Sequence, residues 1–176
     1  MTSNHRRIRS ESGQAVIEFA TVVLLMTILI FGLVDYSRAI YDSEVITNLT
    51  REGSNLASRG TDMPAAATDI ISQSDLPNMT TQGEVIITSV QNIGGTYTIT
   101  NQAIAGSYPG PSKVGSKIGG AATLPPAAKS IPLAGQTIYV TEVYYGYTAI
   151  TPIGSLMKLM GGPTNLPAAL YDIAYF

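Results

Sequence analysis

The chain has 176 residues, of which 45% are hydrophobic and 12% charged, and its formal net charge is −2. This length suffices for one membrane-spanning helix and one small domain, but not for two sizeable cores. The absence of cysteine excludes disulfides and thiolate metal sites. The single histidine, His5, lies in a short N-terminal segment, and a chain from which this segment is cut would lack both His and Cys and with them the usual nucleophile–base pairs and most zinc sites. We therefore expect no enzyme, no cofactor and no metal. The lack of a basic stripe beyond the N-terminus also argues against nucleic acid as a partner.

An apolar run from Ala15 to Val34 dominates the N-terminal part of the chain. As a helix, its roughly twenty residues span about 30 Å, the thickness of the hydrocarbon core of a bilayer. The preceding segment carries a basic cluster, formed by His5, Arg6, Arg7 and Arg9. Such a cluster keeps the N-terminus cytoplasmic, so we expect a single-pass protein with its C-terminal domain outside the cytoplasm. A removable signal peptide fits poorly, because its apolar core usually runs roughly 7–15 residues.

Glu18 interrupts the apolar run close to its start. A carboxylate without a partner is costly at membrane depth. One interpretation is that Glu18 lies near the cytoplasmic headgroups and reaches toward water, which costs little. The other depends on Gly13, because a cut after this glycine would make Gln14 the first residue and Glu18 the fifth. A small residue at the cut, a basic leader and a glutamate at that position resemble the processing site of type IV prepilins.

That resemblance implies roles for three residues. Gly13 and Gln14 would flank the cut by a prepilin peptidase, and Glu18 would register subunits during assembly. Its carboxylate would pair with the free amine of Gln14, in the same or a neighbouring subunit, which offsets part of the cost of burying either charge alone. In the alternative, the chain stays uncleaved and Glu18 is only an interfacial side chain.

The helix is predicted to continue beyond the membrane, because residues 35–59 contain no proline. Apolar residues recur there at intervals close to four and predict one buried stripe. These residues are Tyr41, Val45, Leu49 and Leu56, with Gly53 filling the gap. Gly60 and then Pro64 end the pattern. Gly32 and Gly53 are either bends or close-contact points, or tolerated glycines that each cost about 1 kcal/mol.

A connector rich in Ala, Thr, Asp, Ser and Pro is predicted over residues 61–83, with a short helix at 64–72 and a turn at 76–79. Its aspartates, Asp62, Asp69 and Asp75, fit no calcium loop, so we interpret them as solvated.

From residue 84 the hydrophobic pattern changes to a period of two residues. The runs 84–90 and 97–100 are β-branched and flank a turn at 92–95, which predicts a hairpin.

The segment 105–132 is dense in Gly, Pro, Ala, Lys and Ser and predicts a long exposed loop, either an adhesive or subunit-contacting surface or a merely variable loop. The strongest strand covers residues 136–148. Both of its faces are apolar or aromatic, so we expect a central strand with the long helix on one face and another element on the other. Its tyrosines indicate core packing or a binding platform. Residues 153–160 predict a short amphipathic helix, and residues 168–176 an edge strand or a docked tail.

These elements predict an α+β fold, in which a long N-terminal membrane-spanning helix packs on a small antiparallel β-sheet domain. The predicted domains are a basic leader at 1–13, the long helix at 14–60 with its membrane span to about residue 34, the connector at 61–83 and a β-rich extracytoplasmic domain at 84–176.

Two blocks of the sequence resemble a known family. The first covers residues 6–60 and includes Gly13-Gln14-Ala15-Val16-Ile17-Glu18-Phe19, the segment from Phe31 to Ala39 and the segment from Asn48 to Gly53. The second, looser block covers residues 136–153 and includes Thr151-Pro152. Both are similar to the TadE-like family, minor pilins or pseudopilins of the tight-adherence (Tad) pilus, a branch of type IV pili. The chain departs from that family in having Glu18-Phe19, where Glu-Tyr is frequent, and in lacking an arginine-containing C-terminal ending.

The resemblance implies a pilin-like subunit, without enzymatic activity, that acts in assembly of a Tad-type pilus for surface adhesion. Its implied partners are a prepilin peptidase, other pilin subunits, the pilus assembly machinery and membrane lipid along residues 15–34. Its implied location is the bacterial inner membrane, with a cytoplasmic N-terminus, before incorporation in the pilus. The alternative function is that of an uncleaved, single-pass, membrane-anchored binding domain outside the cytoplasm.

Overall fold

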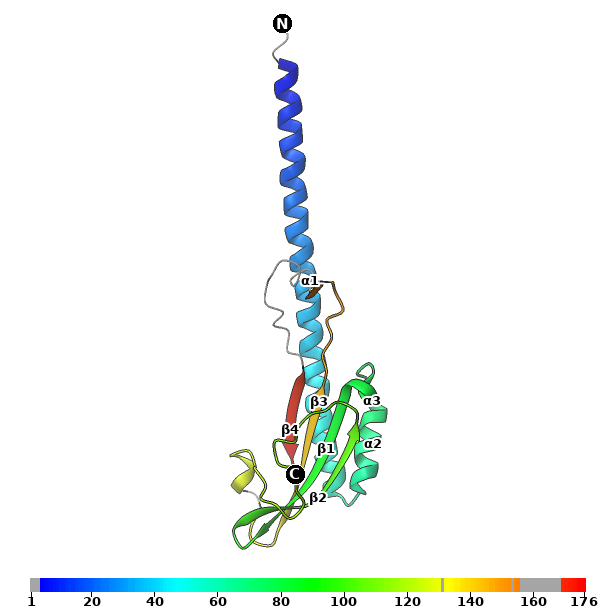
Figure 1. The fold of residues 1–176 in the computed structure, drawn as a ribbon, viewed down its shortest axis with the longest axis vertical. Helices are drawn as coiled ribbons and strands as arrows, with labels where there is room; N and C mark the ends of the chain where they lie inside the picture. The colour runs from blue at the N-terminus through cyan, green and yellow to red at the C-terminus, as the bar shows by residue number, and fades with distance from the viewer. Residues whose placement is uncertain (1–3, 131, 153, 156–168) are drawn as a thin grey trace. The chain divides into compact units, whose positions relative to one another are not determined.

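The structure, a computed structural model, describes residues 4–130, 132–152, 154–155 and 169–176. The fold is α+β, as predicted (Figure 1). Its described elements are α1 (Asn4–Ser58), α2 (Met63–Gln73), α3 (Met79–Gln82), β1 (Gly83–Ile93), β2 (Thr96–Gly106), the 3-10 turn η1 (Ala128–Ser130), β3 (Thr137–Tyr145) and β4 (Leu170–Tyr175). The chain divides into two compact units, an anchor unit of residues 1–38 and 149–166 and a sheet unit of residues 39–148 and 167–176. Helix α1 contributes to both units.

Helix α1 begins at Asn4 and includes residues 4–13, whereas the predicted start at Gln14 is that of a chain cut after Gly13. Residues 4–13 contain no proline that would break the helix. It ends as predicted, next to Gly60. This glycine adopts a φ of +87°, and the N–H groups of Gly60 and Thr61 bond to the carbonyls of Ala57 and Leu56 at 3.1 and 3.2 Å. That pair of bonds is the Schellman motif, which satisfies the last helical carbonyls.

The sheet is fully antiparallel, with the strand order β2-β1-β3-β4. The predicted hairpin is confirmed as β1 and β2, joined by a tight turn in which Gly94 and Gly95 have φ values of +60° and +88°. The prediction that β3 is an inner strand is confirmed, and of the two alternatives for the C-terminal segment the structure shows the edge strand, β4. The helix predicted over residues 153–160 lies largely outside the described residues.

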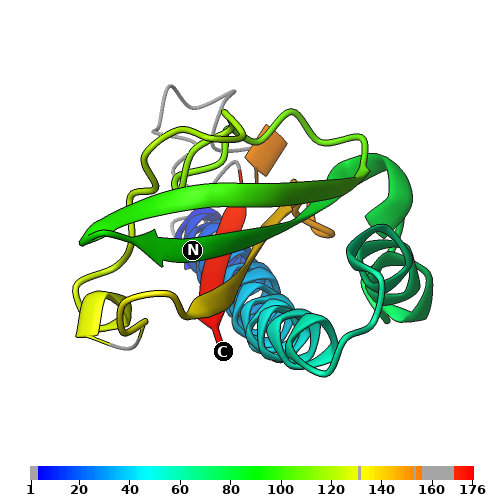
Figure 2. The same ribbon diagram turned by 90° about the horizontal axis from the view of Figure 1, so that it is seen from below.

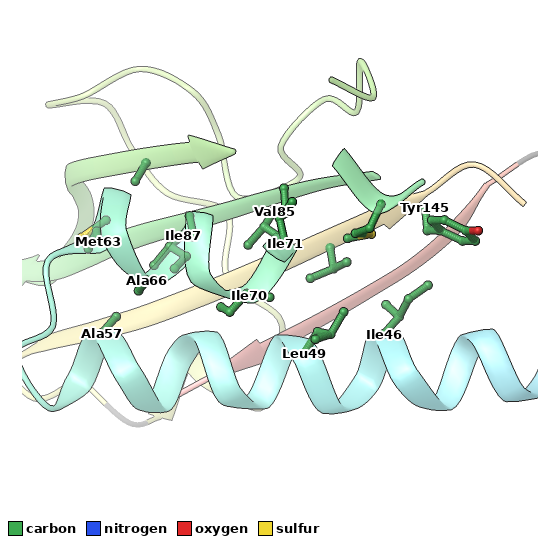
Figure 3. Close-up of a cluster of buried hydrophobic side chains, with 14 of the residues drawn as sticks. Ile46, Leu49, Ala57, Met63, Ala66, Ile70, Ile71, Val85, Ile87 and Tyr145 are labelled. Carbon is green, nitrogen blue, oxygen red and sulfur yellow. The ribbon is translucent and has the colours of Figure 1, made fainter. Parts of the chain in front are cut away.

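The short predicted helix is also confirmed, as α2, and it belongs to the core. Its Ala66 and Ala67 are fully buried and Ile70 is 2% exposed. Helices α1 and α2 cover the same face of the sheet (Figure 2). The cluster between them is shown in Figure 3 and includes Ile46, Leu49, Ala57, Met63, Ala66, Ile70, Ile71, Val85, Ile87 and Tyr145.

The predicted apolar stripe on the second half of α1 is partly wrong. Leu49 and Gly53 are buried, but Tyr41 is 51% exposed. The true buried face includes two polar residues, which bond to β4: Thr50 Oγ1 donates to Asp172 Oδ2 and Ser54 Oγ to the carbonyl of Ala174, each at 3.0 Å. A pattern based on apolar residues missed this face, because its hydroxyl groups are buried together with their acceptors.

Gly53 is a close-contact point, as one of the two predicted alternatives stated. A Cβ at this position would lie 2.7 Å from Thr141 Cγ2 and 2.8 Å from Ile70 Cδ1. Helix α1 therefore approaches β3 and α2 more closely than any residue with a side chain allows. The role of Gly32 stays a prediction.

The opposite face of the sheet is covered by the segment between β2 and β3. Val114, Leu124 and Ala128 of this segment are buried against residues of β1 and β3. The prediction of a long exposed loop over residues 105–132 is thus partly wrong, since residues 105–106 belong to β2 and three apolar residues of the loop are buried against the sheet. Most of the described residues from 107 to 129 are exposed, as predicted. The few apolar residues of the loop have no helical or strand period, so the sequence pattern could not reveal their burial.

Candidate functional site

The first half of α1 has an apolar surface that is exposed on all sides. Ile17, Phe19 and Leu29 are 69%, 70% and 66% exposed, and neighbouring valines and leucines are similar. Within the described residues, α1 from Gly13 onward contains a candidate membrane span. Its most apolar 18-residue window has a mean hydropathy of 2.5, and none of that window is buried. An exposed apolar surface of this extent is stable only against lipid or other apolar helices. The length and composition of this helix thus suggest a membrane anchor.

The polar residues inside the run are compatible with that surface. Thr21 Oγ1 donates to the carbonyl of Ile17 at 2.9 Å, and Thr27 Oγ1 donates to that of Val23 at 2.8 Å. Both hydroxyls are thereby satisfied within one turn of their own helix. Neither threonine brings an unpaired polar group into an apolar environment.

The three residues singled out by the sequence lie together on α1. Gly13 is exposed, and nothing lies within 4 Å of a Cβ built on it. Gln14 Nε2 donates to Glu18 Oε1 at 2.9 Å, across one helical turn. Gln14 and Glu18 therefore share one face of the helix, with Gly13 next to Gln14 at its N-terminal end.

Asp35 forms a second polar site, which sequence reasoning missed. It directly follows the apolar run and is only 1% exposed. Its Oδ1 accepts hydrogen bonds from the backbone N–H groups of Ile150 and Thr151 at 3.0 and 3.1 Å, and its Oδ2 accepts one from the Thr151 hydroxyl. The contact lies within the anchor unit and joins the two blocks of sequence that resemble TadE-like proteins. Neither Asp35 nor Thr151 shows a sequence pattern from which its contact with the other could be predicted.

Glu142 is the corresponding buried carboxylate of the sheet unit, on β3. Its side chain is fully buried and accepts hydrogen bonds from Ser112 Oγ at 2.5 Å, Lys113 N at 2.7 Å and Tyr171 Oη at 2.9 Å. Nearby, Glu84 Oε2 accepts a bond from Gly110 N at 2.7 Å. The two carboxylates hold the segment after β2 against the sheet, which is a structural role.

Burial shifts the titration of this cluster. It raises the pKa of Glu84, against the lowering effect of the Gly110 hydrogen bond and with a further rise from the Glu142 charge. It also raises the pKa of Tyr144 to about 12, helped by the charges of Glu142 and Glu84. The pKa of Tyr171 rises for the same main reason, and its hydrogen bond to Glu142 adds to the effect.

The tyrosines of β3 and its C-terminal extension are packing residues rather than a binding platform. Tyr144, Tyr145 and Tyr147 are 6%, 3% and 8% exposed. Tyr144 Oη donates to the carbonyl of Pro111 at 2.6 Å, and Tyr145 Oη to that of Pro77 at 3.0 Å.

Over the described ranges, no group of three His, Cys, Asp or Glu side chains is placed to hold a metal ion.

Comparison with known proteins gives a match that lies in α1. Residues 13–55 match the model of the family described as TadE-like protein. No curated protein sequence and no solved structure matches the chain. The matched region begins at Gly13, includes Gln14, Glu18 and Asp35, and ends within α1. This match supports a structural protein related to the Tad pilus. The resemblance is thereby confirmed for residues 13–55, which are similar to TadE-like proteins.

Proposed function

We propose that this protein is a TadE-like minor pilin or pseudopilin, cut by a prepilin peptidase between Gly13 and Gln14, that acts in assembly of a Tad-type pilus for surface adhesion. One observation carries the proposal: the family match over residues 13–55 includes the part of α1 whose apolar side chains are exposed. Such a helix suits a subunit that is held in lipid first and among the helices of other subunits later.

The position of Glu18 supports a role in that transfer. A cut after Gly13 turns the backbone nitrogen of Gln14 into a charged amine, one helical turn from the Glu18 carboxylate. In the uncut chain the two side chains already bond at 2.9 Å, so an attractive contact across this turn needs no rearrangement of the helix. The amine of Gln14, in the same or a neighbouring subunit, then compensates the carboxylate in a helix bundle.

The proposed location follows from the same segment. The basic residues Arg6, Arg7 and Arg9 keep the N-terminus in the cytoplasm, and the apolar run crosses the bacterial inner membrane. The sheet unit then lies outside the cytoplasm. The proposed partners are the prepilin peptidase, other pilin subunits, the assembly machinery and lipid along residues 15–34.

The processing step is tested by the intact mass and N-terminal sequence of the protein from its own cells, with and without the prepilin peptidase. We expect a chain that starts at Gln14 only when the peptidase is present. A Gly13→Phe variant should stay uncut because the small residue at the cut is lost, and it should fold normally because a Cβ at Gly13 meets nothing within 4 Å. A wild-type chain that keeps residues 1–13 under both conditions would instead support an uncleaved, membrane-anchored binding domain.

A further inference from the structure

Asp35 occupies an unusual position for a buried carboxylate. It is the first charged residue after the apolar run, whose roughly twenty residues match the hydrocarbon thickness of a bilayer. Burying such a group without partners would be costly. Asp35 avoids that cost by accepting the N–H groups of Ile150 and Thr151 and the Thr151 hydroxyl. The segment 149–151 is thereby held against α1 at the level where the hydrocarbon ends.

This segment presents an apolar side chain at that level. Ile150 is 60% exposed, although its backbone nitrogen lies 3.0 Å from Asp35 Oδ1. On α1, Leu33 and Tyr36 lie at about the same level as Asp35, on other faces of the helix, and are 66% and 64% exposed. Burying the whole side chain of an isoleucine such as Ile150 stabilises by about 1.5–3 kcal/mol. Tyrosines such as Tyr36 are enriched at membrane–water interfaces. No charged residue interrupts the sequence from Thr148 to Pro152.

We propose that Ile150 and the segment 149–151 form a second contact with the membrane, at its headgroup–acyl boundary, and that Asp35 positions it. The occupant of this surface is lipid, because the hydrogen bonds to Asp35 hold the segment beside the end of the apolar run that enters the bilayer. The Asp35 carboxylate thus satisfies the backbone N–H groups of the segment, while the Ile150 side chain faces the acyl chains. The inference rests on the membrane anchoring of α1 proposed above and extends it to a part of the chain distant in sequence.

Single-cysteine labelling of the full chain tests this contact, because the protein has no cysteine of its own. Ile150→Cys and Ile118→Cys are labelled with nitrobenzoxadiazole and reconstituted in vesicles of phosphatidylethanolamine and phosphatidylglycerol. Ile118 is the matched control, since it is also 60% exposed but belongs to the sheet unit. We expect a blue-shifted emission at position 150, quenching by lipids with spin-labelled acyl chains, and several-fold weaker quenching by iodide than at position 118.

A third label, at Leu24→Cys, separates the two proposals. If positions 24 and 150 are both quenched from the lipid phase, the contact is supported. If position 24 is quenched and position 150 behaves like 118, the contact is overturned while the anchor stands. If position 24 also behaves like 118, the anchoring itself fails.

The role of Asp35 is tested in the Ile150→Cys background. Asp35→Ala removes the acceptor of three hydrogen bonds, so iodide quenching at position 150 should rise toward that at position 118. The label at position 118 and the circular dichroism spectrum report whether this variant still folds. Unchanged lipid quenching at position 150 in a folded Asp35→Ala protein would overturn the positioning role. Should the variant not fold, the comparison of positions 24, 118 and 150 in the otherwise native chain still decides the contact.

Discussion

Glu18 carries a carboxylate on an otherwise apolar helix surface, where Gln14 is its hydrogen-bond donor. In a bundle of such helices, a buried charge without an opposite charge beside it carries a large free-energy cost of desolvation. Glu18→Ala would leave the amine of Gln14 without its carboxylate. We therefore expect pilus yield to fall about tenfold or more, with normal membrane insertion. Sheared-filament yield and the membrane fraction of the subunit measure the two effects separately.

Glu52 offers a matched control for that variant. It is an exposed glutamate on the same helix, beyond the apolar run. Glu52→Ala should leave both pilus yield and membrane insertion close to wild type. An equal loss in both variants would indicate a general effect of charge, and a normal yield for Glu18→Ala would contradict the proposed registration of subunits.

Two buried threonines should respond in opposite ways to the same substitution. Thr141 Oγ1 has no hydrogen-bond partner within the described part of the chain, whereas Thr50 Oγ1 donates to Asp172. Thr141→Val should be neutral or stabilise the fold by up to about 1 kcal/mol, because a methyl group replaces an unsatisfied hydroxyl. Thr50→Val should cost about 1–3 kcal/mol, because Asp172 loses its donor. Urea denaturation of the full chain in detergent measures both free energies, and the reverse order would contradict these roles.

At the scale of elements, the crossing of α1 over the sheet depends on Gly53. Gly53→Ala raises helix propensity by about 1 kcal/mol but places a methyl group within 2.8 Å of Thr141 and Ile70 side-chain atoms. Overpacking typically costs about 1–3 kcal/mol, so we expect a net loss of stability. Thr141→Ala removes two of the clashing atoms and should recover part of that loss. A double-mutant cycle with no coupling between the two positions would show that the contact is not limiting.

The layer formed by the segment between β2 and β3 should loosen in alkali. The pKa of Tyr144 is raised from 10.0 to about 12 in the folded chain, chiefly by burial, so folding favours the neutral phenol. This contribution is fully present below pH 10 and is lost as the pH rises through 12. The urea concentration at the unfolding midpoint should therefore decrease as the pH rises from 10 to 12.

Tyr144→Phe should make that pH dependence less steep, because phenylalanine has no proton to lose, while Tyr171, whose pKa is also raised by burial, keeps the remaining part. Tyr41→Phe is the control, since Tyr41 is 51% exposed and lies outside this layer. The urea midpoint of the control should follow the wild-type curve. A Tyr144→Phe curve as steep as that of the wild type would assign the alkaline transition to other groups.

For the whole molecule, α1 serves two units with different surfaces. Its first half presents exposed apolar side chains, while its second half buries Ile46, Leu49 and Ala57 against α2 and the sheet. The change occurs within one uninterrupted helix, so length and helix propensity alone do not reveal it. One helix thus contains both a candidate membrane span and a sheet-packing segment, and the two differ in composition without a break in the helix.

The sequence by itself determined the features that depend on neighbouring residues. The apolar run, the stop at Gly60, the hairpin turn at Gly94-Gly95 and the two-faced strand β3 all leave local patterns of composition or period, and the structure confirms them. The same holds for the TadE-like segment, which the family match confirms over residues 13–55. The roles of Gly13, Gln14 and Glu18 stay predictions that rest on this segment.

Only the tertiary structure decided which polar residues are buried and what they hold. Asp35 bonds to residues 115 and 116 positions away, and Thr50 bonds to a residue 122 positions away. Glu142 holds the segment that was expected to be an exposed loop. A hydrogen bond between distant residues leaves no period in the sequence, because each partner alone has the appearance of an ordinary surface residue. Burial becomes visible only when the fold brings donor and acceptor together.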